Sequence, residues 1–400
     1  MDFPRRGTTD LWLLSGCQAL FMTTSILTIT IASVAARDLA ARPALATLPQ
    51  ATVPLVAMLA AVPAAALMRR RGRRAGFALG ALAGVASGAI SALALWRGSY
   101  ALFLVGVAAL GLYQAFATYY RFAVADEAPE RLRGRAVSFV LGGGVVAAVL
   151  GPSLAGATAD LVPAVPFLGA YLATIGLNLA ALVAVRTLRL GAAPPTSTST
   201  PTARPPPRAL LATPRYALAA ACCATGQGVM MLVMTATPLA MLGHGHTLGF
   251  ASLVISWHVL AMFVPSFFSG ALIGRVGLRP VLGAGAALMV GSALVAAAGT
   301  DGAHFAAALV LNGLAWNLLF VGGSTLLAGI ENPDERAAVQ GANEVLSFGA
   351  TALATFASGA IYFSIGWRVL NGVGIVAIAG LVVLMLALGT RPFEPPAESR

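Results

Sequence analysis

Long apolar runs, separated by short polar connections, fill most of the chain. Twelve of these runs have the length of about 20 residues that a helix needs to cross roughly 30 Å of hydrocarbon. The pattern therefore predicts an all-α membrane protein with twelve transmembrane helices. The runs lie at 11–35, 46–68, 75–96, 100–123, 136–158, 164–186, 216–241, 251–273, 279–299, 304–329, 340–363 and 367–389.

The stretch between the sixth and seventh runs has a different composition. Residues 192–208 read AAPPTSTSTPTARPPPR, and their six prolines and Ser/Thr run neither form a helix nor bury a core. We therefore expect a six-helix bundle at 1–190, a linker at 191–212 and a second six-helix bundle at 213–400. A repeat supports this division, because RRGRR at 70–74 is followed 205 residues later by RVGLR at 275–279. The two bundles are predicted to be pseudo-symmetric.

Composition and charge narrow the function classes. Hydrophobic residues make up 58% of the chain and charged residues 10%, whereas a soluble domain carries about 25% charged residues. A water-soluble enzyme and a disordered scaffold are thereby excluded. The net charge of +11 comes from arginines in short connections, so no soluble basic face exists for nucleic acid. The three cysteines lie in apolar runs without metal-ligand spacing, and we expect neither metal nor cofactor.

The distribution of arginine predicts the orientation in the membrane. If the N-terminus is cytoplasmic, the cytoplasmic segments hold 20 arginines and the opposite side holds four. This bias follows the positive-inside rule, so both termini are expected in the cytoplasm.

Three motifs resemble those of the major facilitator superfamily. The segment from Ala65 to Arg74 resembles the family's G-x-x-x-D-R-x-G-R-R loop, with Ala65 and Arg69 in place of the first glycine and the aspartate. Residues 270–280 look like a second copy without the acid. Residues 151–156, GPSLAG, resemble the G-P-x-x-G-G signature of many antiporters. The family's arginine in the middle of helix four has no counterpart, which puts its usual proton coupling in doubt.

The resemblance implies a gate on the cytoplasmic side. In the family, the arginine-rich loop braces helix two against helix eleven, and its arginine pairs with an acid at the end of helix four. Asp126 and Glu127 occupy that acid position here, and Glu344 lies about one turn into helix eleven. Arg73 with Asp126, and Arg69 or Arg70 with Glu344, are then expected partners, with Arg275 as the counterpart in the second copy. A purely topogenic role of these arginines is the alternative.

The family arrangement also places helices one, four, seven and ten around a central cavity. Polar and aromatic residues near their midpoints are therefore candidates for substrate binding, whereas packing between helices is the alternative. Arg121, within a span, could instead extend its charge to the cytoplasmic surface. The candidates are Gln18, Thr24, Tyr113, Gln114, Arg121, Gln227, Met231, Trp316, Asn317 and Phe320.

Coupling and bending have fewer candidates. His258 is the histidine within a span and is a candidate proton relay, with hydrogen-bonded packing as the alternative. No Asp or Glu lies at mid-depth in any run. Gly151 and Pro152 are expected to bend helix five and pack it tightly.

Together these features predict a monomeric secondary transporter of the bacterial inner membrane. It would move a small amphipathic or apolar molecule by alternating access, with proton-coupled export as the leading mode. Uptake of a nutrient or vitamin-like solute, by symport or uniport, is one alternative, and a transporter-like receptor that moves nothing is another. The expected partners are the substrate, the lipid bilayer and protons. An ATP-driven pump is disfavoured, because the chain has neither a phosphate-binding G-x-x-x-x-G-K-[ST] loop nor any lysine.

Overall fold

The computed structural model describes residues 5–120, 123–124, 140, 142–188, 211–328 and 333–389, and these residues contain helices and no strand. The first half of the chain forms α1 (Arg5–Leu39), η1 (Pro43–Leu45), α2 (Leu48–Arg71), α3 (Arg73–Arg97), α4 (Tyr100–Ala117), α7 (Gly143–Thr158) and α8 (Leu168–Thr187). The second half forms α10 (Pro214–Gly243), α11 (Leu248–Phe263), α12 (Ser266–Val276), α13 (Leu278–Ala298), α14 (Gly302–Ala328), α15 (Pro333–Ile365) and α16 (Trp367–Leu388).

The helices match the predicted spans in type and order. Among the described residues, ten helices are long and apolar enough to cross a membrane, and α11 with α12, bent by 43° at their junction, make an eleventh when the pair is counted as one span. The 16-residue apolar helix α7 is the described part of the fifth run. The predicted all-α membrane fold is therefore confirmed, while the predicted linker lies mostly outside the described residues.

Helix starts follow from local side-chain chemistry. Thr213 accepts a hydrogen bond from the Tyr216 amide at 3.2 Å, and Pro214 occupies the first helical position of α10. Thr247 accepts from the Phe250 amide at the start of α11. These caps satisfy amides that have no partner within the first helical turn.

Two single-residue turns show the predicted repeat in three dimensions. Gly72 joins α2 to α3 with φ 82° and ψ 158°, and Gly277 joins α12 to α13 with φ 88° and ψ 161°. A positive φ of this kind strains any residue with a Cβ atom, so both turns favour glycine. The two glycines are 205 residues apart, which is the offset of the arginine-rich motifs around them.

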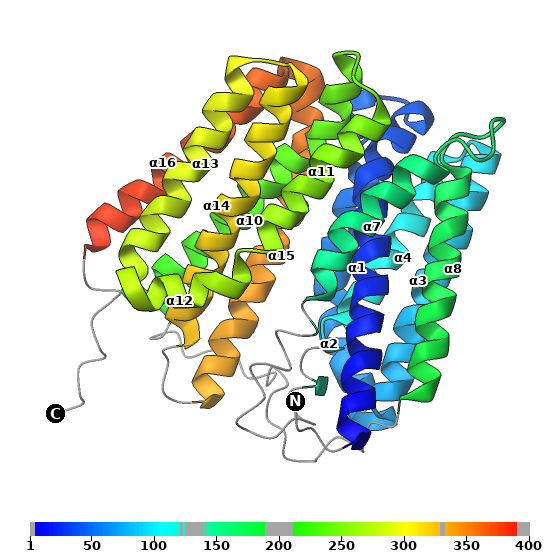
Figure 1. The fold of residues 1–400 in the computed structure, drawn as a ribbon, viewed down its shortest axis with the longest axis horizontal. Helices are drawn as coiled ribbons and strands as arrows, with labels where there is room; N and C mark the ends of the chain where they lie inside the picture. Colours follow the sequence, from blue (N-terminus) through cyan, green and yellow to red (C-terminus); the bar gives the residue numbers. More distant parts are fainter. Residues whose placement is uncertain are drawn as a thin grey trace.

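The helices form two groups that lie side by side (Figure 1). In the first group α3 packs against α4 and α8, and α1 packs against α7 and α8. In the second group α10 packs against α14 and α15, and α13 packs against α14 and α16. We call the end at which α1 and α15 begin the proximal end, and the opposite end the distal end.

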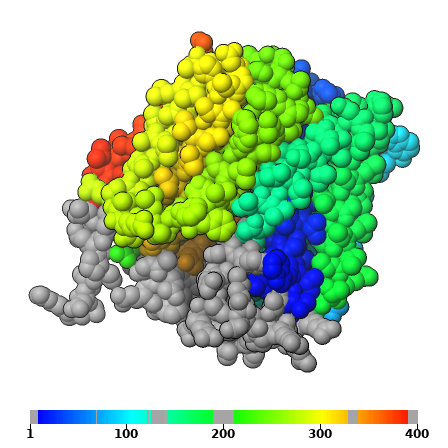
Figure 2. Space-filling view, in the orientation of Figure 1, coloured from blue at the N-terminus to red at the C-terminus, as the bar shows by residue number. Residues whose placement is uncertain are grey.

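The two groups meet mainly along α7 with α11 and α2 with α15, and α1 also contacts α10. Figure 2 shows the α7 surface (teal) against that of α11 (yellow-green). Near the distal end, a Cβ added at Gly156 would lie 3.6 Å from the Ser252 hydroxyl, whereas one at Gly144 would lie 3.3 Å from the Phe263 ring. Thr47, just before α2, hydrogen-bonds to α15. The groups are therefore closed against each other from mid-depth to the distal end.

Candidate functional site

The four helices predicted to line the site are packed together. The helix α1 contacts α4 and α10, and α10 contacts α14, so the candidate residues come from one connected set of helices. Their side chains nevertheless fall into two classes. Some are half-buried, and others are buried between neighbouring helices.

The centre of the second group holds a stacked aromatic pair. Trp316 and Phe320, one turn apart on α14, have ring centroids 5.0 Å apart and planes at 10°. Phe263 of α11 approaches Trp316 edge-on at 6.2 Å. The Trp316 indole Nε1–H donates to Oε1 of Gln227 on α10 at 2.5 Å. Phe263 was not among the residues predicted from the sequence. It lies in the eighth apolar run, five residues after the candidate His258, and this position was the available signal.

Two glutamines of the first group have no hydrogen-bonding partner for their side chains among the described residues. Gln18 on α1 and Gln114 on α4 are half-buried, and neither side chain hydrogen-bonds to any residue that the structure describes. An amide at membrane depth without a partner costs several kcal/mol if hydrocarbon surrounds it. These amides are therefore best accommodated where they face water or a ligand.

Thr24 and Tyr113 are instead enclosed within the first group. The Thr24 hydroxyl donates to Oδ1 of Asn178 on α8 at 3.2 Å, and both residues are buried. Tyr113 is fully buried and meets the Phe21 ring edge-on at 4.9 Å. Asn178, which lies within the sixth run, was not selected from the sequence. In the described conformation Thr24 and Tyr113 contribute packing.

Asn317 stabilises the break between α11 and α12. Its Nδ2 donates to the Met262 carbonyl at 2.7 Å and to the Ser266 hydroxyl at 2.6 Å. Its Oδ1 accepts from the Ser269 hydroxyl at 2.5 Å. Pro265 lies at this break and has no amide hydrogen to continue the helix. The Asn317 amide therefore compensates for the interrupted backbone. The sequence instead predicts that Asn317 binds substrate, from its position in the tenth apolar run.

Two other predicted residues lie in the core of the second group. Met231 is buried in the largest hydrophobic cluster, to which the buried Trp316 also belongs. His258 is completely buried, with its Nδ1 at 2.7 Å from the Leu309 carbonyl on α14, and no described residue hydrogen-bonds to its Nε2. This environment agrees with the packing alternative for His258, and a relay role remains a prediction.

The predicted gate residues are described only in part. Arg121, Asp126 and the side chain of Arg69 lie outside the described residues. Arg70 and Arg275 are exposed at the proximal ends of α2 and α12, and Glu344 is half-buried on α15. The expected ion pairs therefore remain predictions.

The predicted bending element packs closely against α1. Pro152 lies within α7, and a Cβ added at the neighbouring Gly151 would come within 2.9 Å of Ile26. Only a glycine allows the two helices this approach. The gating role predicted for Gly151 and Pro152 stays a prediction.

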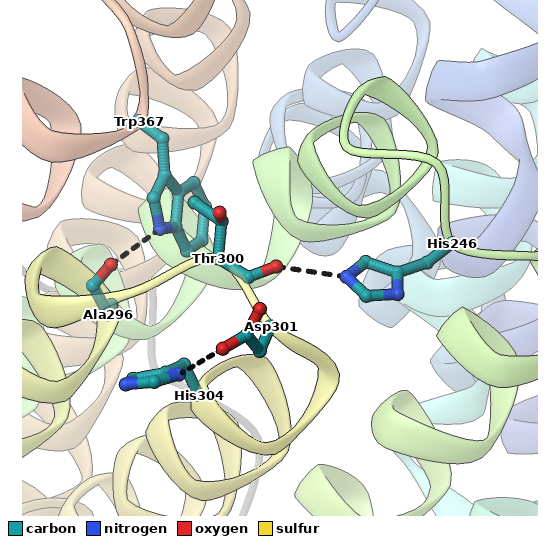
Figure 3. Close-up of polar contacts among 6 residues, drawn as sticks. All are labelled: His246, Ala296, Thr300, Asp301, His304 and Trp367. Carbon is teal, nitrogen blue, oxygen red and sulfur yellow. Dashed lines mark hydrogen bonds and ion pairs between the residues drawn. The ribbon is translucent and has the colours of Figure 1, made fainter.

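Polar contacts connect the distal loops of the second group (Figure 3). His246 lies with Nε2 at 2.9 Å from the Thr300 carbonyl, and Trp367 donates from Nε1 to the Ala296 carbonyl at 2.8 Å. His304 lies 3.8 Å from Asp301. Within the described ranges, no group of three or more His, Cys, Asp or Glu could hold a metal ion. His246 thus links the loop before α11 to the loop before α14, whereas His304 makes a local contact within the start of α14.

Comparison with known proteins agrees with this architecture. The sequence profile of the Major Facilitator Superfamily matches residues 13–250 and 216–400, which together cover nearly the whole chain. The chain belongs to the major facilitator superfamily. It is a membrane transporter and not an enzyme, and the fold class and family predicted from the sequence are confirmed.

Relatives of this transporter include proteins with and without an assigned substrate. The riboflavin transporter RfnT of Brucella anthropi is 37% identical over 387 residues, which is 97% of each chain. The uncharacterised transporter YddS of Bacillus subtilis is 30% identical, over 85% of this chain and 80% of its own.

Solved structures support the fold. A D-xylose–proton symporter matches with a TM-score of 0.74 at 13% identity, covering 94% of this chain and 97% of its own. A bacterial homologue of the human lysosomal transporter Spinster, in an inward-facing and unoccupied conformation, matches with a TM-score of 0.68 at 14% identity, covering 98% and 97%.

Proposed function

We propose that this transporter takes up riboflavin, or a closely related neutral flavin, across the bacterial inner membrane. The observation that carries the proposal is the 37% identity to a riboflavin transporter over 97% of both chains. Of the modes left open by the sequence, vitamin uptake is thereby favoured over proton-coupled export.

The candidate site supports this chemistry. Riboflavin is an uncharged molecule with a flat tricyclic ring, whose pyrimidine edge carries carbonyl and N–H groups. Aromatic rings at the site provide apolar flat surfaces, and the half-buried amides of Gln18, Gln114 and Gln227 can both donate and accept hydrogen bonds. Sites of this kind bury most of a ligand against apolar side chains and orient it with a few polar groups.

Transport would follow from movement of the two bundles about the site. We assign residues 1–190 and 213–400 to these bundles and residues 191–212 to the linker. The bundles meet from mid-depth to the distal end. If both termini are cytoplasmic, as the arginine distribution favours, the distal end faces outward and the described conformation is closed to the outside. Uptake then requires the distal contacts to separate so that the site opens outward.

Uptake of radiolabelled riboflavin tests the proposal directly. A bacterial strain that can neither make nor import riboflavin should accumulate the label and grow on low riboflavin only when it expresses this chain. Riboflavin-loaded cells distinguish export, because an exporter would speed loss of label without supporting growth. No riboflavin-dependent growth and no label movement would contradict the proposal. Addition of a protonophore during uptake then reports whether protons are coupled to it.

A further inference from the structure

The indole of Trp316 is held in one orientation. Its single hydrogen-bond donor is used by Oε1 of Gln227 at 2.5 Å, and Phe320 covers one ring face in a stacked arrangement at 5.0 Å. The Phe263 ring stands at 66° to the Trp316 ring, with ring centroids 6.2 Å apart. Contacts from α10, α11 and its own helix therefore fix the plane of this ring before any ligand arrives, which reduces the entropy lost on binding.

The same hydrogen bond prepares Gln227 for a polar ligand group. Its Oε1 accepts from Trp316, while no described residue accepts from its NH2 group, and the side chain is only half-buried. The amide therefore presents a fixed donor beside the aromatic pair. A flat heterocycle with carbonyl groups along one edge matches this combination of a ring surface and a donor.

We propose that the half-buried ring of Phe320, with the buried indole of Trp316 stacked behind it, forms the stacking surface for the ring system of the substrate, and that Gln227 binds a carbonyl on the ring's polar edge. The proposal rests on the proposed function and adds that the tricyclic ring, and not the ribityl chain, determines recognition. Offset stacking between aromatic rings adds to the effect of buried apolar area, so a flat ring gains more here than a flexible polyol.

The position of Phe263 connects this surface to the first bundle. Its ring lies against Gly144 of α7, where a Cβ would come within 3.3 Å, and its edge faces Trp316. A ring bound on the Trp316–Phe320 pair would therefore lie beside the contact between α7 and α11. Substrate recognition would occur next to a surface that changes when the bundles move.

The test is riboflavin binding to the purified full-length protein, measured as the quenching of flavin fluorescence. We expect Trp316→Leu and Phe320→Leu each to weaken binding at least tenfold, because each removes a ring and keeps an apolar side chain. Trp257→Leu on α11 is the matched control, since Trp257 is 41% exposed whereas Trp316 is buried, and it should stay within twofold of wild type. Thermal unfolding identifies variants that fail to fold. Trp316→Tyr, which keeps an aromatic face, should retain more affinity for riboflavin than Trp316→Leu.

Competition identifies which part of the substrate is bound. Lumiflavin, which has the ring system without the ribityl chain, should displace riboflavin, whereas ribitol in thousandfold excess should not. Displacement by ribitol alone, or folded Trp316 and Phe320 variants with wild-type affinity, would overturn the stacking surface while leaving riboflavin uptake intact. A wild-type protein that binds no riboflavin would instead overturn the proposed function and, with it, this inference.

Discussion

The hydroxyl of Thr47 joins the two bundles at the distal end by two hydrogen bonds to α15. It accepts from the Gly359 amide at 3.2 Å and donates to the Phe356 carbonyl at 3.3 Å. Thr47 is fully buried, so water does not compete for these bonds. The contact depends on the missing side chain of residue 359, because a Cβ there would lie 2.5 Å from the Thr47 hydroxyl and 3.0 Å from the Ala44 carbonyl.

Gly359→Ala should therefore open the distal contact. A Cβ at 2.5 Å forces the helices apart, and overpacking of this kind costs about 1–3 kcal/mol. The population should shift toward the distal-open state by roughly five- to a hundredfold. Spin-label distances between the distal ends of α2 and α15 measure this shift. Gly349→Ala on the same helix is the control, since no atom lies within 4 Å of a Cβ there. Equal distance distributions for Gly359→Ala and wild type would show that the contact does not hold the bundles together.

Thr47→Val separates the hydrogen bonds from the packing. Valine has nearly the same shape as threonine, so the change removes both bonds and keeps the volume. We expect a shift in the same direction that does not exceed that of Gly359→Ala, about 1–2 kcal/mol for the two bonds, because a net hydrogen bond contributes roughly 1 kcal/mol. Thr47→Ser should restore the wild-type distances, and a Thr47→Val effect larger than that of Gly359→Ala would contradict the steric interpretation.

Asn317→Ala should lower stability more than substrate affinity. The change leaves the Met262 carbonyl and the Ser266 and Ser269 hydroxyls without this partner at the α11–α12 break. A buried group that loses its partner costs about 1–3 kcal/mol, which thermal unfolding of the purified protein would detect. If the variant unfolds at the wild-type temperature but binds riboflavin much more weakly, Asn317 contacts the substrate, as its position in the sequence first predicted.

Replacing Gln18 or Gln114 by leucine should have the opposite effect. No described residue hydrogen-bonds to either amide, so no buried partner is left behind and the unfolding temperature should hold. Each change should weaken riboflavin binding roughly fivefold if the amide donates to or accepts from the substrate. Loss of stability without loss of affinity would place these glutamines in helix packing.

His258→Ala tests the proton-relay hypothesis against packing. The imidazole is buried against the Leu309 carbonyl, and a large-to-small change in a core costs about 2–5 kcal/mol. We expect a lower unfolding temperature and an unchanged ratio of uptake at pH 5.5 to uptake at pH 7.5. His304→Ala, at the distal surface, is the control for histidines outside the core. A folded His258→Ala variant whose uptake no longer depends on pH would support the relay.

The sequence by itself determined the class of this protein, because the lengths of apolar runs are set by the bilayer and need no knowledge of tertiary contacts. The same local physics placed Gly72 and Gly277 at equivalent turns, since a one-residue reversal between helices favours a residue without a Cβ. The sequence also selected Gln227, because an amide at mid-depth is costly without a partner, and the aromatic residues Trp316 and Phe320 from the position of their run in the family arrangement.

Only the tertiary structure decided which side of each helix a candidate faces. Hydrophobicity around these helices is nearly uniform, so the 3.6-residue period that separates inside from outside in soluble proteins carries little information here. In the sequence, Thr24 and Asn317 resemble Gln18 and Gln114 as polar residues near mid-depth. In the structure, however, Thr24 hydrogen-bonds to Asn178 and Asn317 to Met262, and both partners lie more than 40 residues away in the chain. Such long-range pairing arises when helices pack, because a buried polar group is bound by whichever partner the packing brings to it.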